Sequence, residues 1–337
     1  MKKYTFVKFM NSFFSLACIF AFVTYTLQLL VSLPVAIIYI IADSNYLYNR
    51  SLFEQMHPFA TPLFLYGILT IICFAYILLM LITKKDRLIL KTMFSKKFSN
   101  ICLSLFIGLL FGGGLNFLGA LIPLIRGELV LKVSDSFNVL GLIFILFLVF
   151  FQSAGEEIAS RGFVMQRLIY RYKKPWLAIL LSSLLFGIAH LLNANVTFVS
   201  FLEIIASGVM LALLAYAFDN YYLAFAAHCG WNYMQNIVLG LPNSGNPSTF
   251  SIFEVVQQPM NTSFSYNPFF GVEGACSTLI LNIIVDLILV FICIKSKKKR
   301  NIWVEAGLDI DNVKKVVKEK NTKKDSDDTI NEDISES

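Results

Sequence analysis

The chain has 337 residues, of which 57% are hydrophobic and 15% are charged, and its formal net charge is +6. This composition excludes an ordinary soluble domain and is typical of a polytopic membrane protein. The sequence contains no nucleic-acid-binding motif, so we expect membrane lipid as a partner and no nucleic acid.

Repeated apolar stretches of about 20 residues, the length that a helix needs to cross the hydrocarbon core, predict an all-α protein with about eight transmembrane helices. The first stretch is longer than the apolar core of a signal peptide, which is about 7–15 residues, and this favours a retained helix that is tilted or broken near Pro34. The third contains Gly108, Gly112, Gly113 and Gly114, which predict close helix packing. The predicted spans are 12–41, 60–83, 101–125, 137–156, 176–194, 199–218, 222–240 and 275–294.

Lysines and arginines are concentrated at the N-terminus, after the second, fourth and eighth spans, and are sparse in the other loops. Because cytoplasmic loops carry the excess of positive charge, we expect a multi-pass protein of the cell membrane with both termini in the cytoplasm. Three regions follow: N-terminal helices in 1–135, a membrane core in 136–295, and a polar tail in 296–337 that is expected to be disordered or a fraying helix.

Two adjacent acids, Glu156 and Glu157, end the fourth apolar stretch, and Arg161 follows four residues after the second. Carboxylates in this position are costly to desolvate, so they require a partner or a function. Residues four apart share a helix face, so Glu157 and Arg161 are expected to pair, while Glu156 points about 100° away. An ordinary charge cluster at a helix end is the competing interpretation.

Two of the three histidines, His190 and His228, also lie in apolar segments. Lys173, in the predicted turn at 173–175, lies 17 residues after Glu156 and 17 residues before His190. In an antiparallel helix pair the two side chains therefore reach a similar depth, about 25 Å from the turn at 1.5 Å per residue. At one depth a carboxylate and an imidazole can share a nucleophilic water. The match requires a kink, tilt or protrusion, because a helix over 137–172 is longer than the bilayer is thick.

His228 and Asn232 are four residues apart and present hydrogen-bond donors to one side of the seventh span. Such a pair suits the oxyanion of a tetrahedral intermediate, and His228 also suits a metal site. A buried histidine satisfied by a neighbouring helix is the structural alternative. The third histidine, His57 beside Pro58, is expected at the surface.

Three motifs occur in order: Glu156-Glu157-x-x-x-Arg161, then Phe186-Gly-Ile-Ala-His190, then His228-Cys-Gly-Trp-Asn232. Together they resemble the CAAX prenyl protease and bacteriocin-processing family (CPBP, also called Abi). The Gly208-Val-Met-Leu-Ala-Leu-Leu run between the second and third motifs is similar as well. The resemblance covers about 140–240 and leaves the first three spans and the tail outside it.

The resemblance implies that Glu156 and His190 activate a water, while His228 and Asn232 stabilise the oxyanion. It also favours a glutamate-dependent mechanism without a cofactor. The residues leave zinc open, since Glu156, His190 and His228 are suitable ligands, although no His-Glu-x-x-His motif is present.

Supporting roles are implied for three further residues. Glu157 and Arg161 would position the motif helix, and Phe186 would pack beside His190. Two single acids inside spans, Glu203 and Asp286, are expected to be structural, paired with Arg161 or another cation or placed near a span end.

The sequence therefore predicts an intramembrane endopeptidase with its active site inside the bundle, acting on a membrane-associated peptide or protein. Peptide processing or bacteriocin self-immunity is the expected context. One alternative is a non-catalytic immunity or regulatory protein of the same fold that binds a membrane partner. A transporter is another, because buried acids and histidines also form proton relays, but the halves show no inverted repeat.

Overall fold

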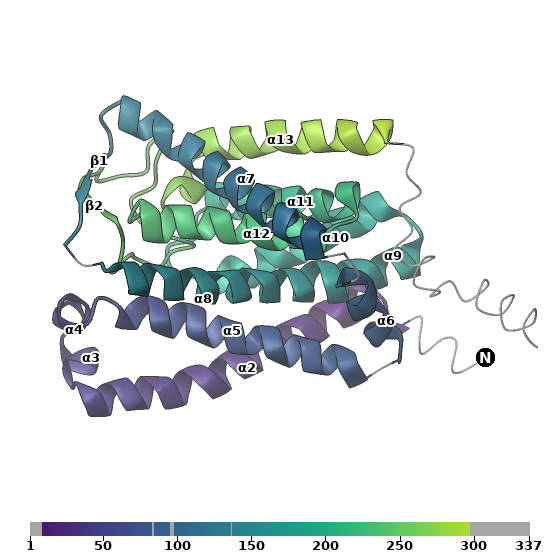
Figure 1. Ribbon diagram of the computed structural model, residues 1–337, viewed down its shortest axis with the longest axis horizontal. Coiled ribbons are helices and arrows are strands. Elements are labelled where there is room, and N and C mark those ends of the chain that lie inside the picture. Colours follow the sequence, from purple (N-terminus) through teal and green to yellow (C-terminus); the bar gives the residue numbers. More distant parts are fainter. Residues whose placement is uncertain (1–8, 83, 95–97, 136, 297–337) are drawn as a thin grey trace, which may run out of the picture.

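The computed structural model describes residues 9–82, 84–94, 98–135 and 137–296, which form a bundle of long helices (Figure 1). The α-helices are α2 (Phe13–Ala42), α3 (Asn45–Tyr48), α4 (Arg50–Met56), α5 (Ala60–Ile82), α6 (Lys84–Met93), α7 (Phe98–Ile125), α8 (Val139–Glu157), α9 (Gln166–Tyr172), α10 (Pro175–Ala189), α11 (Phe198–Phe218), α12 (Tyr221–Asn232) and α13 (Cys276–Lys295). Two π-helices, η1 (Ile158–Met165) and η3 (Tyr233–Val238), and two short 3-10 helices, η2 (His190–Leu192) and η4 (Val272–Gly274), complete the helical elements of these residues.

Within the described ranges, seven helical segments are long and apolar enough to cross a membrane. They correspond to seven of the eight predicted spans and confirm a multi-pass, all-α membrane protein. The remaining predicted span, 222–240, forms α12 and η3 and is also helical. It falls outside those seven because His228 and a series of amides interrupt its apolar character. The first span is one continuous helix through Pro34 and is not broken there.

The long helices lie roughly side by side, with α2 and α5 along one side of the view and α13 along the other (Figure 1). Helix α7 crosses in front of α12, and α10 and α11 lie behind them. The beginning of α2 and the end of α13 lie at the same end of the bundle, which an even number of crossings requires. Residues 1–8 with their lysines, and the predicted disordered tail from 297 onward, lie outside the described residues.

Local sequence signals account for the ends of the helices that carry the motifs. The turn predicted at 173–175 forms: Lys173 adopts the left-handed conformation with φ of 56°, and Pro175 is the first residue of α10. A proline is favoured there because the first turn of a helix leaves its N–H groups unpaired. The Asn220 side chain accepts a hydrogen bond from the Tyr222 N–H and so starts α12.

The helix that begins at Val139 continues to Tyr172 without a break, because η1 joins α8 to α9. In the view of Figure 1, α9 extends past the turn between α11 and α12, so the excess length protrudes at that end of the bundle. All of η1 is buried. Short π-helical segments inside α-helices are frequent at functional sites, and this one follows Glu157 directly.

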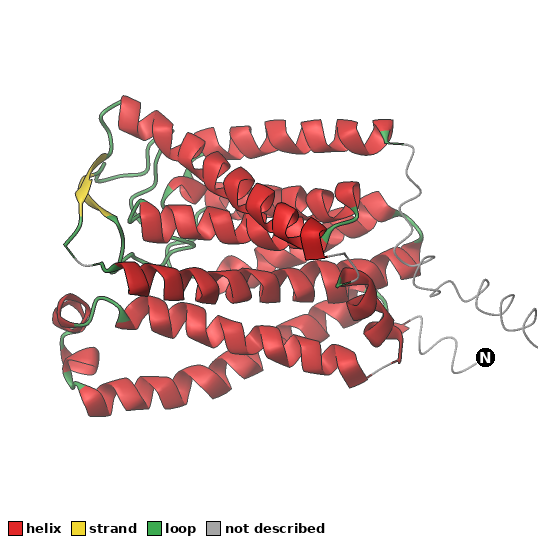
Figure 2. Ribbon diagram, in the orientation of Figure 1, coloured by secondary structure: helices red, strands yellow, loops and turns green. Residues whose placement is uncertain are grey.

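A small β-ribbon was not predicted from the sequence. Strand β1 (Val130–Val133) pairs antiparallel with β2 (Phe253–Gln257) at the end of the bundle opposite α9, shown in yellow in Figure 2. Lys132 lies opposite Glu254 in the register, and their side chains form an ion pair of 2.7 Å. The ribbon thus ties the loop after α7 to the long loop before α13.

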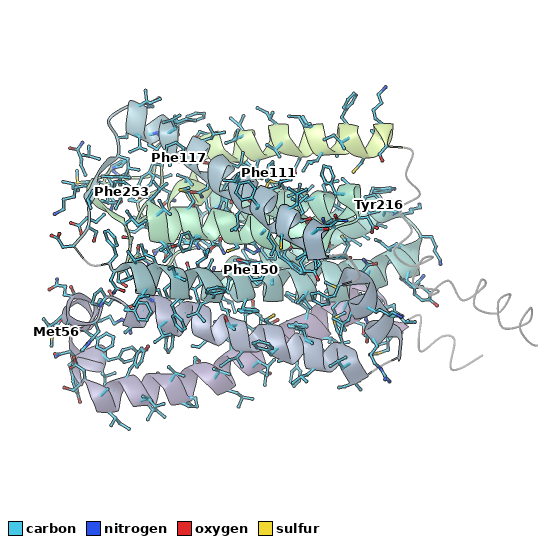
Figure 3. The ribbon with its side chains drawn as sticks, in the orientation of Figure 1. Met56, Phe111, Phe117, Phe150, Tyr216 and Phe253 are labelled. Carbon is cyan, nitrogen blue, oxygen red and sulfur yellow. The ribbon has the colours of Figure 1, made fainter. Side chains whose placement is uncertain are left out.

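The outer faces of the bundle are apolar, as the side chains in Figure 3 illustrate. Only 11% of the most apolar window of α2 and 22% of that of α13 are buried inside the protein. A water-exposed surface of this kind would be very unfavourable, whereas lipid accepts it. Exposed apolar residues on these two helices include Phe22, Leu30, Ile38, Ile284, Leu287 and Phe291.

The glycines of α7 allow α12 to approach closely, as their spacing predicted. A Cβ at Gly112 would overlap the backbone carbonyl of Ala227, and one at Gly108 would lie 2.6 Å from the Ala226 Cβ. A Cβ at Gly230 of α12 would lie 2.4 Å from the Leu109 carbonyl oxygen in the same way. Small residues on both helices therefore set the position of α12.

We expect Gly112→Ala to destabilise the fold by about 1–3 kcal/mol, because the new methyl group forces α7 and α12 apart. Gly114→Ala is the matched control on the same helix, since its Cβ meets nothing within 4 Å. That change should be neutral or slightly stabilising, because alanine is the better helix former. The measurement is the free energy of unfolding in mixed micelles, and equal values for the two variants would contradict the packing account.

Candidate active site

Glu156 lies at the end of α8 with its carboxylate in a cavity of about 550 Å³. Its Oε1 accepts a hydrogen bond of 2.6 Å from Gln152 Nε2, one helical turn earlier. The side chain is 24% exposed, in contrast to its neighbour Glu157, which is fully buried. The two adjacent acids therefore face different surroundings, as the angle between them predicted.

Glu157 and Arg161 form the predicted pair, with 2.8 Å between Arg161 Nη1 and Glu157 Oε1, and neither side chain is exposed. Arg161 Nη2 also donates to the Gly208 carbonyl oxygen at 2.6 Å, and the guanidinium carbon lies 4.7 Å from the centre of the Phe186 ring. The guanidinium thereby joins η1 to α11 and α10. This is a buried tie between helices and differs from the alternative of a surface charge cluster.

His228 contacts both acids. Its Nδ1 lies 3.0 Å from Glu157 Oε1, and its Nε2 lies 3.8 Å from Glu156 Oε2. Glu157 is held as a carboxylate by Arg161 and can only accept, so Nδ1 carries the proton of that hydrogen bond. The Nε2 atom of His228 is therefore the one directed to Glu156 and the cavity.

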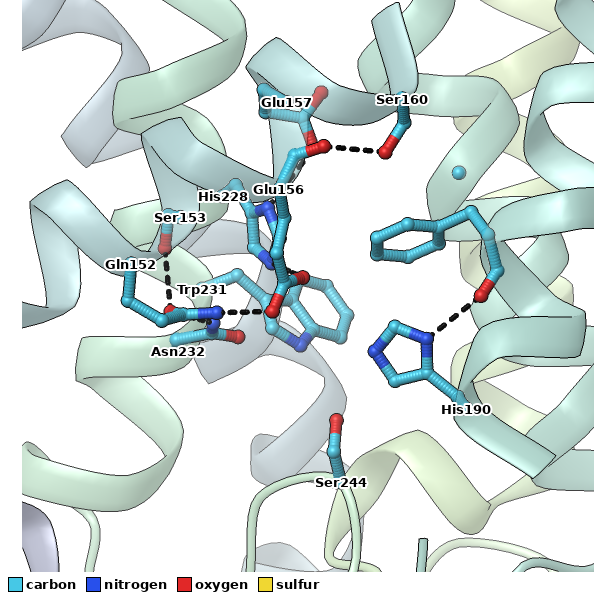
Figure 4. Close-up of polar contacts among 12 residues, drawn as sticks. Gln152, Ser153, Glu156, Glu157, Ser160, His190, His228, Trp231, Asn232 and Ser244 are labelled. Carbon is cyan, nitrogen blue, oxygen red and sulfur yellow. Dashed lines mark hydrogen bonds and ion pairs between the residues drawn. The ribbon is translucent and has the colours of Figure 1, made fainter. Parts of the chain in front are cut away.

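His190 approaches the same cavity from the end of α10 (Figure 4). Its Nδ1 lies 2.8 Å from the carbonyl oxygen of Phe186, which can only accept, so Nδ1 is again the donor and Nε2 is left facing the cavity. The Phe186 ring lies 4.6 Å from the His190 ring and 6.0 Å from the His228 ring, centre to centre. Phe186 thus packs between the two imidazoles.

In Figure 4 the carboxylate of Glu156 and the ring of His190 are directed toward the same region of the site. Among the described residues, no hydrogen bond joins these two side chains directly. Both line the cavity together with His228 and Asn232. Glu156 and His190, which the sequence predicted to lie near each other, therefore face one cavity.

Gln152 links Glu156 to Asn232. Because the Glu156 carboxylate accepts from the Gln152 amide nitrogen, the Gln152 amide oxygen is turned to Asn232, whose Nδ2 donates to it at 3.1 Å. One of the two Nδ2 hydrogens of Asn232 is used in this way, which leaves one for a ligand. Gln152 was not predicted as a site residue, although its spacing of four from Glu156 in an apolar run was an available signal.

A second group of residues near His190, which includes Glu273 and Ser244, was not predicted from the sequence. Glu273 of η4 accepts hydrogen bonds from Trp231 Nε1 at 2.8 Å and from the backbone N–H of Ser244 at 2.8 Å. Burial raises the pKa of Glu273, and these hydrogen bonds oppose the effect. Ser244 lines the cavity, so Glu273 fixes the loop that bounds the site on this side. Single residues of a long polar loop carry no periodic signal that would have revealed them.

Glu203, Asp286 and His57 lie outside the lining of the cavity that holds Glu156. Glu203 accepts from Ser207 Oγ at 2.9 Å and from Asn282 Nδ2 at 2.6 Å, so the option that it pairs with Arg161 is wrong. Asp286 is one turn further along α13 from Asn282. His57 has a side chain that is 45% exposed and lies 3.1 Å from Asp43, which places it at the surface as predicted.

A metal ion bound at this site would need three or more protein ligands. Over the parts of the chain that the structure describes, no group of three or more His, Cys, Asp or Glu side chains is arranged to hold one. Glu156, His190 and His228, the set that zinc would need, do not form such a group. The arrangement is instead that of two imidazoles and an amide around one accessible carboxylate.

Residues 138–234 match the family model of the type II CAAX prenyl endopeptidase Rce1-like proteins. No curated protein and no solved structure matches the chain. The matched residues include every predicted site residue, from Glu156 to Asn232, and agree with the extent of the resemblance seen in the sequence. Residues 138–234 are therefore similar to the type II CAAX prenyl endopeptidase Rce1-like family, in agreement with the resemblance that the three motifs indicate.

Proposed function

We propose that the protein is an intramembrane endopeptidase whose nucleophile is a water held between Glu156 and His190. The observation that carries the proposal is the convergence of the Glu156 carboxylate, the two imidazole Nε2 atoms and the Asn232 amide on one cavity inside the helix bundle. These are the groups that hydrolysis requires: a base, a partner that orients the water, and donors for the developing oxyanion.

In the proposed reaction, Glu156 accepts a proton from the water as its oxygen attacks the carbonyl carbon of the scissile bond. His190 accepts the second hydrogen bond of that water through Nε2. When the tetrahedral intermediate collapses, the proton passes from Glu156 to the leaving amine, so that the enzyme is restored. The general-base step is expected to contribute about 10²–10⁴-fold in rate.

The two histidines differ in the group behind each ring, and this difference supports different roles. The Nδ1 of His228 donates to a carboxylate, which stabilises a positively charged ring, whereas the Nδ1 of His190 donates to a neutral carbonyl. We therefore assign the oxyanion to His228, which acts as a donor when both nitrogens carry protons, with Asn232 beside it. Glu157 and Arg161 position His228.

We further propose that the substrate is a membrane-associated peptide or protein in the cell membrane and that both termini of the enzyme are cytoplasmic. The basic loops support this orientation. A CAAX box is a C-terminal motif of prenylated proteins, but an unmodified membrane peptide is the better candidate here. Processing of a secreted peptide, or self-immunity to a bacteriocin, is the proposed biological context.

A binding protein of the same fold would not depend on the chemistry of these side chains, and this separates the two functions. We expect His190→Ala to reduce processing of peptides by at least about 10²-fold, because the water loses its second partner. His57→Ala is the matched control and should leave processing unchanged, because His57 lies at the surface.

Wild type and both variants are compared at equal expression, by mass spectrometry of the cellular peptides and by survival of the host against a bacteriocin. If protection persists in His190→Ala and no peptide changes, the protein acts by binding. Loss of processing in both histidine variants would show that the assay reports stability instead of catalysis.

A further inference from the structure

A second, smaller cavity of about 30 Å³ adjoins the one that holds Glu156. The wall that the two cavities share consists of Phe186, His190, His228, Asn232 and Ser244. These are the side chains around the proposed nucleophile. The other walls of the small cavity come from α11, α12 and Glu273. Glu156 lines the large cavity only, so the wall with the two imidazoles separates it from the small one.

Glu203 of α11 lines the small cavity and is only 1% exposed. Both of its hydrogen bonds end on one oxygen, Oε1, which accepts from Ser207 Oγ at 2.9 Å and from Asn282 Nδ2 at 2.6 Å. Among the described residues, no group donates to Oε2 and no cation pairs with Glu203. The chain has no Lys or Arg between Lys174 and Lys295, which includes all of α10 to α12. A buried acid of this kind requires a further polar partner.

Water is the ligand that fits the small cavity. A buried water needs a cavity of at least about 10–15 Å³ and two or more polar partners. The volume of about 30 Å³ is therefore enough for one or two water molecules and too small for a peptide side chain of any length. Glu203, Ser207 and Glu273 all line the cavity and supply the polar groups. A water molecule beside Glu203 Oε2 provides the partner that this oxygen lacks within the protein.

Hydrolysis inside the bundle needs a supply of water, because each cleaved bond consumes one molecule. A peptide in the large cavity covers the route by which solvent reaches Glu156, and closure of a site around its substrate expels water. The small cavity is not on that route. A water molecule that leaves it through the shared wall arrives beside His190 and His228, where the nucleophile is needed.

We propose that the small cavity is a binding site for water, the second substrate of the hydrolysis, and that it resupplies the nucleophile while a peptide occupies the large cavity. This inference rests on the proposed function and deepens it. Glu203 is the positioning residue of this site: it holds the water through Oε2 and does not contact the peptide, because it does not line the large cavity. The role accounts for an intramembrane acid that has no ion pair.

The first test detects the water without an assay of activity. A brief X-ray pulse converts water to hydroxyl radicals, which oxidise the side chains next to it, and methionine is readily oxidised. Met210 lines the small cavity and is 1% exposed, whereas Met80 and Met165 are similarly buried and line neither cavity. In the full-length protein in lipid nanodiscs, we expect Met210 to take up oxygen at least about tenfold faster than Met80 and Met165.

The second test fills the cavity. Ile204→Phe adds bulk to its wall on α11 and should lower the labelling of Met210 to the rate of Met80. With a peptide that the wild type cleaves, kcat should fall about tenfold or more, because delivery of water becomes the slow step. The KM should stay within about threefold, because residue 204 does not line the large cavity. Leu202→Phe, on the same helix and outside both cavities, is the matched control and should change neither labelling nor kcat.

A second pair of variants removes the polar partner without adding bulk, since overpacking at residue 204 also strains its neighbours. Glu203→Leu should lower both the labelling of Met210 and kcat, in the same way as Ile204→Phe. Glu203→Gln still presents a polar group to the cavity and should retain most of both. A role of Glu203 in packing alone would not change the labelling of Met210.

The labelling and the kinetics separate this inference from the proposed function. If Met210 is labelled no faster than Met80 in the wild type, the water site is overturned while the endopeptidase assignment stands. If Ile204→Phe and Glu203→Leu lose the labelling but keep the wild-type kcat, water binds in the cavity and the resupply role is overturned. If the wild type cleaves no peptide, the proposed function and the resupply role both fail, and the labelling alone decides whether the cavity binds water.

Discussion

Replacing Glu156 with Gln is expected to lower kcat/KM by about 10³-fold or more, with little change in stability. Gln has nearly the same shape as Glu and retains hydrogen bonding to Gln152, but it cannot accept the proton of the attacking water. The side chain is partly exposed and its negative charge is not required to balance Arg161, which is paired with Glu157. The loss should therefore appear in kcat for peptide cleavage in vesicles and not in the free energy of unfolding.

Two further variants test whether the position of the Glu156 carboxylate, and not acidic charge in general, is required for activity. Glu156→Asp keeps the charge but withdraws the carboxylate by about 1 Å, which should still cost about 10²-fold because the base no longer reaches its water. Glu254→Gln, which alters an exposed acid of the β-ribbon, should have wild-type activity. Glu156→Gln with activity within tenfold of wild type would remove this carboxylate from the mechanism.

Arg161→Met is expected to be the most destabilising single change, at about 3–5 kcal/mol. It would leave the fully buried Glu157 carboxylate without its cation and the Gly208 carbonyl without its donor. His228 would then be the remaining partner of Glu157 among the groups described here. The measurement is the free energy of unfolding in mixed micelles, obtained from a denaturant titration.

The double variant Glu157→Gln/Arg161→Met tests whether the uncompensated charge is the cause. It removes both charges and should be more stable than Arg161→Met alone by at least about 1.5 kcal/mol. The exposed pair Arg50–Glu54 has the same spacing and a distance of 2.7 Å, so Arg50→Met should cost no more than about 1 kcal/mol. Similar losses for Arg161→Met and Arg50→Met would contradict the account of a buried tie.

The two largest predictions together distinguish the adjacent glutamates. Glu156 is accessible and linked to Gln152, so its loss should affect chemistry, whereas Glu157 is buried between Arg161 and His228, so its surroundings affect folding and the position of the ring. A change at Arg161 that lowers activity is expected to act through His228. Glu156→Gln is therefore expected to lower kcat more than stability, whereas Arg161→Met is expected to lower stability more than kcat.

The sequence by itself determined the features that depend on local spacing. Apolar length located the membrane helices, and the turn at 173–175 followed from residues next to each other in the chain. The pairing of Glu157 with Arg161 followed from a separation of four on one helix. Each of these is set within a few turns of backbone, where the period of a helix decides which side chains meet.

Only the tertiary structure decided how the helices are rotated and how deep each one lies. It turned Glu157 to His228 as well as to Arg161 and joined Gln152 to Asn232. It also brought two elements from outside the matched segment to the site: α2 lines the cavity, and Glu273 holds Ser244 beside it. Rotation and depth depend on packing between distant segments, such as the glycine contact of α7 with α12, and on the π-helix that changes the winding after Glu157. The period of one helix contains no information about either quantity, because both are set by contacts between helices.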